Sequence, residues 1–313
     1  MTTGRAFAFL VNPASGGGAA PKVVVPLARA LREAGAEVEV TYTTSAAETP
    51  ALVDAAVDRD AVVVSVGGDG MLSSVAGAVA GRGGVLAVIP AGRGNDFARM
   101  LAIPTDTAAQ AQLLLDAEPR PIDLLRATQP DGSSYVVAGS VYAGVDARAA
   151  EIVDRSHWLP SRLQYPYAAV RALATYRPVE CTLDVDGVRT THQAATVVVA
   201  NSRFYGKGMA IAPTASVDDG LLDVIVIEAA GHLDLIRSLP KVYDGSHVDL
   251  AEVTVRTGWR VSISGTHRGG AAVPVGADGE SLGALSADPT TPLSVELLPA
   301  AVLVLADPAE AGS

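Results

Sequence analysis

A single carboxylate set among glycines is the most distinctive chemical feature of the sequence. The β-branched run Ala61–Val66 ends in Gly67-Gly68-Asp69-Gly70, and a helical pattern over Met71–Ala80 follows at once. Glycines let backbone N–H groups approach a phosphate, and the start of a helix favours negative charge. An aspartate there is unfavourable unless a cation separates it from the phosphates, as Mg²⁺ does in phosphoryl transfer. The alternative is an ordinary strand-to-helix turn in which Asp69 caps the helix.

Two further glycine-rich loops follow predicted strands. Asn12–Gly18 comes after the apolar run Phe7–Val11, and Pro90–Arg99 comes after Val85–Ile89. Each could be ordinary turn chemistry. Open parallel sheets bind ligands at the carboxyl ends of their strands, so the three loops together predict one nucleotide crevice. The first strand is not followed by GxGxxG, which argues against a nicotinamide-dependent dehydrogenase, and the sequence has no Walker A loop.

The order and composition of these loops match a known family. Asn12–Gly16, Gly67–Gly70 and Pro90–Arg99 resemble the diacylglycerol kinase catalytic-domain family, which includes bacterial lipid kinases and sphingosine kinases. The later matching segments, in the same order, are Tyr205–Gly208, Pro213–Asp223 and Ala277–Glu280. The resemblance implies an ATP-dependent lipid kinase that converts diacylglycerol to phosphatidate. It also implies an N-terminal nucleotide domain, a C-terminal β-sandwich and an active site in the cleft between them.

The resemblance assigns roles to individual residues. Asp69 would hold a catalytic Mg²⁺ or its water shell, with Asp96 and Asp123 extending the polar network. Glu280 would be the general base on the lipid hydroxyl, although a hairpin turn needs only the preceding Asp-Gly pair. The residues implied to contact ATP are Asn12, Pro13, Ala14, Ser15, Gly16, Thr43, Gly67, Gly68, Asp69, Gly70, Met71, Leu72, Ser73, Arg93, Asn95 and Asp96.

A second, structural Mg²⁺ site is also implied by the resemblance. Its ligands would be Asp219 and the carbonyl groups of Ser216 and Leu221. The alternative for the turn Asp218-Asp219-Gly220 is a plain β-hairpin.

Two positions depart from the family pattern. Met71 stands where the family usually has the Thr of GGDGT, and Arg93 stands where it often has the Thr of GTxND. Each change removes a hydroxyl that could bind phosphate or ribose. Arg93 could replace that contact with a charge-assisted hydrogen bond, so we expect nucleotide binding to persist with different contacts.

The elements that must position these residues fall into two groups. Strand and helix signals alternate over residues 1–127, which predicts an α/β domain with a parallel, Rossmann-like sheet covered on both faces. Residues 128–299 read as short strands and predict an antiparallel β-sandwich or barrel. The final apolar run Ala300–Ala306 is expected to pack back on the first domain. The other predicted elements are helices over Pro21–Ala34 (its first turn delayed or kinked by Pro26), Ala46–Val57, Thr105–Asp116, Asp146–Tyr176 and Leu233–Tyr243, and strands over Val38–Tyr42, Tyr135–Tyr142, Val179–Val185, Ala194–Ala200, Leu221–Ile227, Val253–Val255 and Val261–Ile263.

Composition excludes several classes of protein. The chain has 313 residues, of which 49% are hydrophobic, and a net charge of −11. This composition is not that of a disordered chain, and the acidity argues against nucleic-acid binding. No apolar run reaches the roughly 18 residues of a membrane span, and the N-terminus does not read as a signal peptide. The single cysteine, Cys181, excludes an internal disulfide and fits a cytoplasmic setting.

The surface that meets the lipid is less clearly marked. His157-Trp158 and Tyr165-Pro166-Tyr167 lie near four arginines in sequence, which are Arg155, Arg162, Arg171 and Arg177. Aromatic rings with arginine suit a surface that contacts lipid headgroups, so a transient, peripheral contact with the inner membrane face is one expectation. The alternative is that these side chains cap the core of the second domain. A homodimer is also left open.

Two competing functions remain. An NAD kinase also carries a GGDG loop, but it is expected to have an Asn-Glu pair for the ribose, and such a pair was not found. A non-catalytic lipid-binding protein on a kinase scaffold would explain Met71 and Arg93, whereas Asp69 and Glu280 argue against it. Transfer of labelled phosphate from ATP to a lipid extract would separate the three functions.

Overall fold

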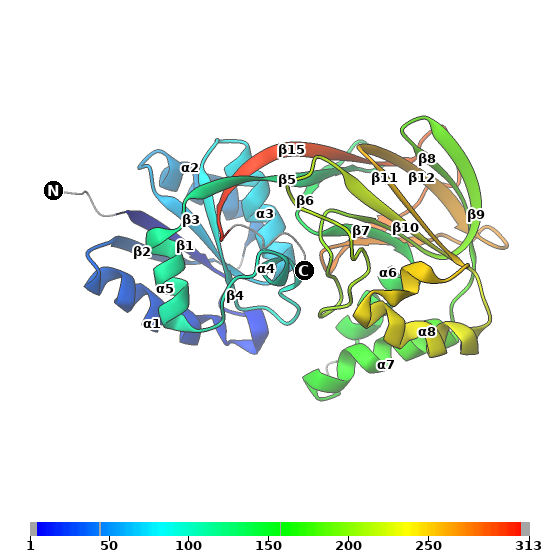
Figure 1. The fold of residues 1–313 in the computed structure, drawn as a ribbon, viewed down its shortest axis with the longest axis horizontal. Helices are drawn as coiled ribbons and strands as arrows, with labels where there is room; N and C mark the ends of the chain where they lie inside the picture. Colours follow the sequence, from blue (N-terminus) through cyan, green and yellow to red (C-terminus); the bar gives the residue numbers. More distant parts are fainter. Residues whose placement is uncertain (1–4, 44, 157, 308–313) are drawn as a thin grey trace. The chain divides into compact units, whose positions relative to one another are not determined.

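The computed structural model describes residues 5–43, 45–156 and 158–307. They form two units. Unit 1 comprises the chain up to Leu124 and from Pro299 onward, and unit 2 comprises Leu125–Leu298. Unit 1 is α/β with a parallel sheet, whereas unit 2 is built from antiparallel strands with helices on one side (Figure 1). The predicted fold class is therefore confirmed for each unit.

The sheet of unit 1 has the strand order β15-β4-β3-β1-β2, and the neighbouring strands are parallel. The elements are β1 (Ala6–Val11), α1 (Ala20–Glu33), β2 (Glu37–Tyr42), α2 (Thr49–Val57), β3 (Val62–Gly67), α3 (Asp69–Ala80), β4 (Val85–Pro90), α4 (Asp96–Met100) and α5 (Thr107–Asp116), with short 3-10 turns at Ser15–Gly17 and Ala46–Glu48. Helices α1 and α5 lie together on one face, and α2 and α3 lie together on the other (Figure 1).

The core of unit 1 follows from the alternation of side chains along each strand. Phe9 and Val64 point to the face that α1 and α5 cover, where they meet Leu27 and Leu114. All six residues of β3 are buried, as expected for a central parallel strand covered on both faces. This packing fixes the carboxyl ends of β1, β3 and β4, from which the three glycine-rich loops extend.

One detail of unit 1 was predicted wrongly. Helix α1 begins at Ala20, so Pro26 does not delay its first turn. Proline removes one helical N–H and leaves the carbonyl of Lys22 without that partner. Both Lys22 and Pro26 are exposed, so water can bind this carbonyl at little cost. The short helix α4 was not predicted, because five residues are too few for a periodic pattern.

Unit 2 contains two layers of strands that share β9 (Val188–Ala200). The N-terminal half of β9 pairs with β8, and its C-terminal half pairs with β7 and β10. Apolar side chains such as Leu183, Val197 and Ile263 fill the core of these strands. The other strands are β5 (Pro119–Thr128), β6 (Ser134–Val137), β7 (Ser140–Gly144), β8 (Val179–Val185), β10 (Leu222–Glu228), β11 (Val253–Gly258), β12 (Arg260–His267), β13 (Pro274–Ala277), β14 (Glu280–Ala284) and β15 (Leu293–Leu305).

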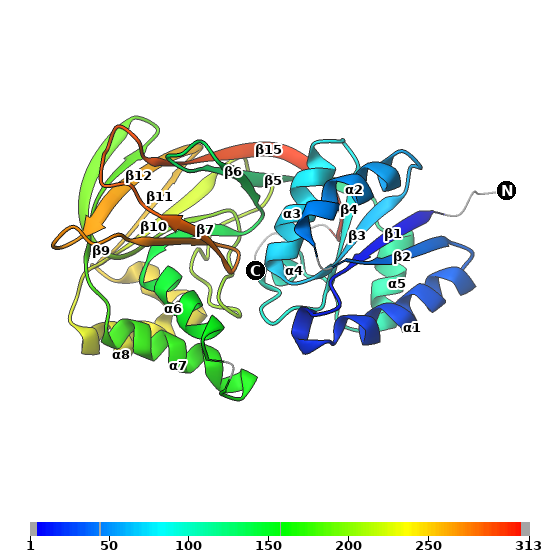
Figure 2. The same ribbon diagram turned by 180° about the vertical axis from the view of Figure 1, so that it is seen from behind.

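Three helices gather on one side of these strands (Figure 2). They are α6 (Val145–Asp154), α7 (Ser161–Ala174) and α8 (His232–Asp244), followed by a 3-10 turn at Ser246–Asp249. A cluster that includes Val145, Ala168 and Tyr176 packs them together. Among the residues that the structure describes, no helix is long and apolar enough to span a bilayer.

Two predictions for unit 2, and one of the alternatives, were wrong in detail. The strand over Tyr135–Tyr142 is divided at Ala138-Gly139, because the backbone there binds a side chain instead of a neighbouring strand. The helix over Asp146–Tyr176 is likewise divided before Ser161, where Pro160 disfavours a continuous helix. The turn at Asp218–Gly220 is not a hairpin, since no strand immediately precedes it in the described chain.

Two strands cross the boundary between the units. The N-terminal part of β15 pairs with β12, and its C-terminal part pairs with β4, with Leu303 opposite Val85. Strand β5 pairs with β15 and β6. At the crossing, Ala300 has a φ of 48°, and its N–H donates to Asp123 Oδ1 at 2.7 Å. Asp123, which was predicted to extend the polar network around Asp69, is buried and accepts a hydrogen bond at this bend.

Candidate active site

The three glycine-rich loops of unit 1 meet at the ends of their strands. A Cβ on Gly16 would lie 2.5 Å from the carbonyl oxygen of Ala91, and a Cβ on Gly92 would lie 2.4 Å from the Cα of Gly68. Gly16 also has a φ of +61°, a conformation that other residues rarely adopt. Only glycine permits these approaches. The loops after β1, β3 and β4 therefore form one continuous backbone surface.

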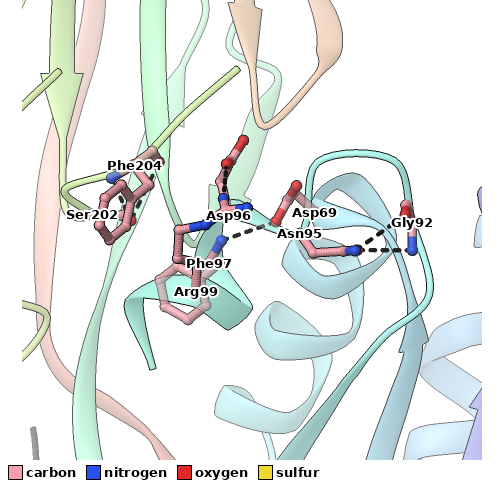
Figure 3. Close-up of polar contacts among 8 residues, drawn as sticks. All are labelled: Asp69, Gly92, Asn95, Asp96, Phe97, Arg99, Ser202 and Phe204. Carbon is pink, nitrogen blue, oxygen red and sulfur yellow. Dashed lines mark hydrogen bonds and ion pairs between the residues drawn. The ribbon is translucent and has the colours of Figure 1, made fainter. Parts of the chain in front are cut away.

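Asn95 locks the third loop in place. Its Oδ1 accepts the N–H of Gly92 at 2.8 Å, and its Nδ2 donates to the carbonyl of Gly92 at 3.1 Å (Figure 3). Asn95 adopts a left-handed conformation, with a φ of 56°, which asparagine tolerates better than most residues. The side chain that was predicted to contact nucleotide thus also shapes the loop.

Two carboxylates converge beside Gly94. A Cβ on Gly94 would lie 3.0 Å from Asp69 Oδ2 and 3.1 Å from Asp96 Oδ2. The other oxygens are held from behind, because Phe97 N–H donates to Asp69 Oδ1 at 3.1 Å and Arg99 donates to Asp96 Oδ1 at 2.6 Å (Figure 3). Gly94 has no side chain to fill this space. The pair of oxygens suits a hard divalent cation such as Mg²⁺.

Two aspartates alone do not complete a metal site. In the described part of the chain, no group of three or more His, Cys, Asp or Glu side chains is placed to bind a metal. Mg²⁺ usually keeps several waters and binds protein through one or two carboxylates together with substrate phosphates. The arrangement of Asp69 and Asp96 fits this pattern.

A small pocket lies beneath the loops and has room for about one water molecule. Its lining consists of Ser65, Gly67, Gly68, Asp69, Leu72, Val88, Pro90, Asn95 and Ala98. Asp69 and Asn95 are among its lining residues, and the pocket is too small to hold a nucleotide.

The remaining residues of the predicted ATP site have different surroundings. Asn12 Oδ1 accepts the N–H of Ala14 at 3.0 Å, which shapes the first loop between Pro13 and Ser15. Thr43 is buried, and its hydroxyl lies 2.6 Å from the carboxylate of Glu48, so a local contact already occupies it.

Residues at the start of α3 are mostly turned inward. Leu72 and Ser73 are buried, so their side chains contribute to packing. Met71 is half-buried and lies over Gly67, because a Cβ on Gly67 would meet its sulfur at 2.8 Å. The Met71 thioether therefore covers the backbone of Gly67 with an apolar group. A threonine at this position would instead present a polar hydroxyl. Gly70, beside it, is in the first turn of α3.

The two arginines of the third loop differ in their environment. Arg93 is exposed at the tip of the loop and is available to an anion. Arg99 is bound to Asp96, which orients that carboxylate. Sequence reasoning gave Arg99 no role. Arg99 follows Asp96 by three residues, a spacing that allows an ion pair within one helical turn. This spacing could have indicated that Arg99 orients Asp96.

Glu280 is exposed at the first residue of β14. The turn before it contains Asp278, with a φ of 45°, and Gly279, with a φ of 88°. The Asp278 carboxylate accepts three backbone N–H groups, from Ala138 and Gly139 at 3.0 Å and from Ser140 at 2.9 Å. The N–H of Gly279 donates to the hydroxyl of Tyr142 at 3.1 Å. Asp278 therefore anchors the turn that carries Glu280.

The proposed second metal ligands lie in the loop before β10. Asp219 Oδ1 accepts the N–H of Leu221 at 3.0 Å, and Ser216 donates to Asp218 at 2.6 Å. Burial raises the pKa of Asp223, and the nearby charge of Asp219 raises it further. This loop concentrates negative charge, which favours a cation, but the geometry alone does not complete a metal site.

Comparisons with known proteins agree with this geometry. A family model for the diacylglycerol kinase catalytic domain matches residues 6–127. A model for the YegS C-terminal NAD kinase beta sandwich-like domain matches residues 139–306. A protein named diacylglycerol kinase from Mycobacterium tuberculosis is 34% identical over 249 residues, which are 78% of this chain and 80% of the relative.

A second relative and a solved structure are also similar to this chain. A protein from Pseudomonas aeruginosa named "Probable lipid kinase YegS-like" is 31% identical over 236 residues, or 74% of this chain and 75% of the relative. The crystal structure of a diacylglycerol kinase from Bacillus anthracis superposes with a TM-score of 0.70 and covers 99% of both chains at 22% identity. This last likeness shows a shared fold.

Proposed function

Since the chain belongs to the diacylglycerol kinase family, we propose that it transfers the γ-phosphoryl group of ATP to the hydroxyl of diacylglycerol and forms phosphatidate. The observation that carries this proposal is the convergence of three glycine-rich loops on the carboxylates of Asp69 and Asp96. We further propose that the reaction takes place at the inner face of the membrane, where such a lipid would be found.

Unit 1 binds and orients the nucleotide in this proposal. The loops after β1, β3 and β4 present backbone N–H groups to the phosphates, and the N-terminus of α3 adds a favourable field. Arg93 supplies a charge-assisted hydrogen bond to a phosphate oxygen. Phe97 N–H and Arg99 hold Asp69 and Asp96 in place, so the two carboxylates need little rearrangement to accept a cation.

Asp69 and Asp96 would hold Mg²⁺ through the oxygens that lie beside Gly94. When bound, the cation neutralises charge that develops on the phosphoryl group. The remaining steps use side chains of the protein. Glu280 accepts the proton of the lipid hydroxyl as its oxygen attacks the γ-phosphorus of ATP, the bond from this phosphorus to the bridging oxygen breaks, and ADP leaves. Asp278 keeps the turn of Glu280 in position.

Transfer of ³²P from labelled ATP tests the proposal directly. We expect diacylglycerol in mixed micelles to become labelled phosphatidate, and we expect Glu280→Gln to lower kcat about 10²–10⁴-fold while the affinity for ATP stays unchanged. Asp69→Asn should be at least as damaging. Glu180→Gln, at an exposed strand position of the same unit, is the matched control and should behave as wild type. Wild-type turnover in Glu280→Gln would leave that residue with no role as base.

The same assay covers the competing functions. NAD offered as acceptor would become labelled if the protein were an NAD kinase. This alternative is worth testing because residues 139–306 match a domain model that is NAD kinase beta sandwich-like. Binding of lipid without any transfer of label would indicate a non-catalytic lipid-binding protein.

A further inference from the structure

One stretch of unit 2 has a charge opposite to that of the whole chain. Residues Arg155–Val179 contain four arginines and no aspartate or glutamate, in a protein with 34 acidic residues and a net charge of −11. The stretch also contains one of the two tryptophans and three of the eight tyrosines. It therefore combines positive charge with amphipathic aromatic side chains in a chain that has few of either.

Several apolar side chains of this stretch are exposed, on α7 or in the segment before it. Trp158 is 72% exposed, Leu163 is 47% exposed and Val170 is 44% exposed. Pro166 is exposed as well. Leu163, Pro166 and Val170 follow helical spacing and so share one face of α7. Exposed apolar groups on one helix face mark a surface that contacts another molecule or a membrane.

The aromatic and basic side chains on this face are ordered by one another. Trp158 packs edge-on against Tyr167, with 5.9 Å between ring centroids. Arg171 donates to the Tyr167 hydroxyl at 2.7 Å and lies 5.8 Å from the centre of its ring. We name Trp158, Leu163, Pro166, Val170 and Arg171 the α7 surface.

Other residues of the stretch pack inward. Tyr176 is buried in the helix cluster, as a core-capping side chain would be. His157 lies outside the described residues, and so do the side chains of Arg162 and Tyr165. Tyr176 was not among the side chains expected to cap the core. Of those that were, Trp158 faces solvent, whereas Tyr167 is half-buried and packs against the helix cluster.

Helix α8 carries charges of both signs: Arg237 lies 3.5 Å from Asp234, and the helix ends at Asp244. It packs beside α7, and Tyr176 contacts His232 with 5.0 Å between the ring centroids. Near this contact Leu233 is 67% exposed, and Arg237 and Lys241 are exposed one and two turns further along α8.

We propose that the α7 surface docks the protein onto a bilayer that contains anionic phospholipids. The inference rests on the proposed function, since a kinase that acts on diacylglycerol must reach a lipid that stays in the membrane. Charge complementarity selects this partner, because arginines attract anionic headgroups even though the rest of the chain is acidic. Trp and Tyr side chains favour the boundary between headgroups and acyl chains. Leu163 and Val170 supply the apolar contact.

Tryptophan fluorescence tests the proposal without reference to catalysis. The chain has two tryptophans, and a Trp259→Phe background leaves Trp158 as the reporter. Vesicles of phosphatidylcholine with about 30 mol% of the anionic lipid phosphatidylglycerol should shift Trp158 emission to the blue, and brominated acyl chains should quench it. Pure phosphatidylcholine vesicles should give a much weaker response.

Two variants separate the apolar and electrostatic contributions. In vesicle co-sedimentation, Arg171→Glu should weaken binding roughly 25-fold, at about fivefold per unit of charge. Trp158→Ala should weaken it roughly tenfold. Arg189→Glu, at a residue of β9 whose side chain is 66% exposed, is the matched control and should bind as wild type. The proposal would be overturned if Arg171→Glu and Trp158→Ala bound vesicles as tightly as the control and the wild type.

Failure of this inference and failure of the proposed function give different results. If wild-type protein phosphorylates a dispersed short-chain diacylglycerol but ignores vesicles, the α7 surface is not a membrane site. If Trp158→Ala changes the sedimentation mass of the free protein, the surface instead binds a second copy of the chain. If vesicles bind but no acceptor is phosphorylated, the proposed function is wrong while the docking surface remains.

Discussion

Replacing Asp278 should damage both stability and catalysis, although its carboxylate is not proposed to touch substrate. The carboxylate accepts three backbone N–H groups across a sequence separation of about 140 residues. Hydrogen bonds to a charged group contribute about 1.5–3 kcal/mol each. Because the three share one carboxylate, we expect Asp278→Ala to lower the free energy of unfolding of unit 2 by about 3–5 kcal/mol.

Asp278→Asn is the sharper perturbation. Asparagine tolerates the φ of 45° and keeps one acceptor oxygen, which can still bind Ala138 and Gly139. Its amide NH₂ then faces the N–H of Ser140, so one hydrogen bond is replaced by two opposed donors. We expect a loss of about 1.5–3 kcal/mol and a fall in kcat of roughly tenfold or more, since small displacements of a catalytic group are costly.

Urea unfolding followed by tryptophan fluorescence measures the stability, because both tryptophans, Trp158 and Trp259, belong to unit 2. The ³²P assay measures kcat, and the KM for ATP should not change. Gly139→Ala provides an independent route, because its Cβ would lie 2.6 Å from Asp278 Oδ1 and would displace the carboxylate.

Asp131→Asn is the matched control, because Asp131 makes hydrogen bonds only within its own exposed turn, to Ser133, as far as the described contacts show. Neither the urea midpoint nor kcat should change in this variant. A wild-type midpoint and wild-type turnover in Asp278→Asn would refute the reasoning, because the turn of Glu280 would then be held by other contacts.

Three further outcomes are expected. Gly92→Ala should abolish the rise in melting temperature that Mg-ATP causes in the wild type, because its Cβ would lie 2.4 Å from Gly68 Cα; a preserved shift would contradict the convergence of the loops. Arg93→Ala should raise the KM for ATP about tenfold and leave the KM for lipid unchanged, and an unchanged KM for ATP would make Arg93 a solvated surface charge. Burial lowers the pKa of His247, whose Nε2 lies 3.1 Å from the carbonyl oxygen of Ile211. The unfolded chain therefore binds the proton more tightly, and stability should fall as the pH drops below about 6.5, with a smaller fall in His247→Gln; urea midpoints that do not change between about pH 7.5 and 5.5 would contradict this.

The parallel half of the fold was predictable because its signals are local. Each strand of unit 1 is an apolar run that ends in a turn, and β3 is buried along its whole length, as its β-branched sequence indicates. The long strands β5 and β15 were not fully recognised, because each lies in both units and its burial pattern changes at the boundary. The β13–β14 hairpin was visible only as an Asp-Gly pair.

The candidate site was predictable where it consists of one contiguous loop. Asp69, Asn95 and Asp96 stand beside glycines in the sequence, which marks their loops as candidate ligand sites. The role of Asp278 could not be found, because its partners at Ala138–Ser140 are about 140 residues away and contribute only backbone atoms. Backbone N–H groups are present in every residue except proline, so the sequence does not indicate which of them bind a distant carboxylate. The inward direction of Leu72 and Ser73 also depends on tertiary packing rather than on sequence.

The path of β15 has a consequence for biosynthesis. Unit 2 is an insertion within unit 1, and the C-terminal part of β15 supplies the strand that covers the edge of β4. A ribosome has therefore translated all of unit 2 before the parallel sheet can close. A nascent or prematurely terminated chain would expose the edge of β4 at Val85 and Leu86, and unpaired edges promote aggregation. The position of this last strand thus makes completion of unit 1 depend on completion of the whole chain.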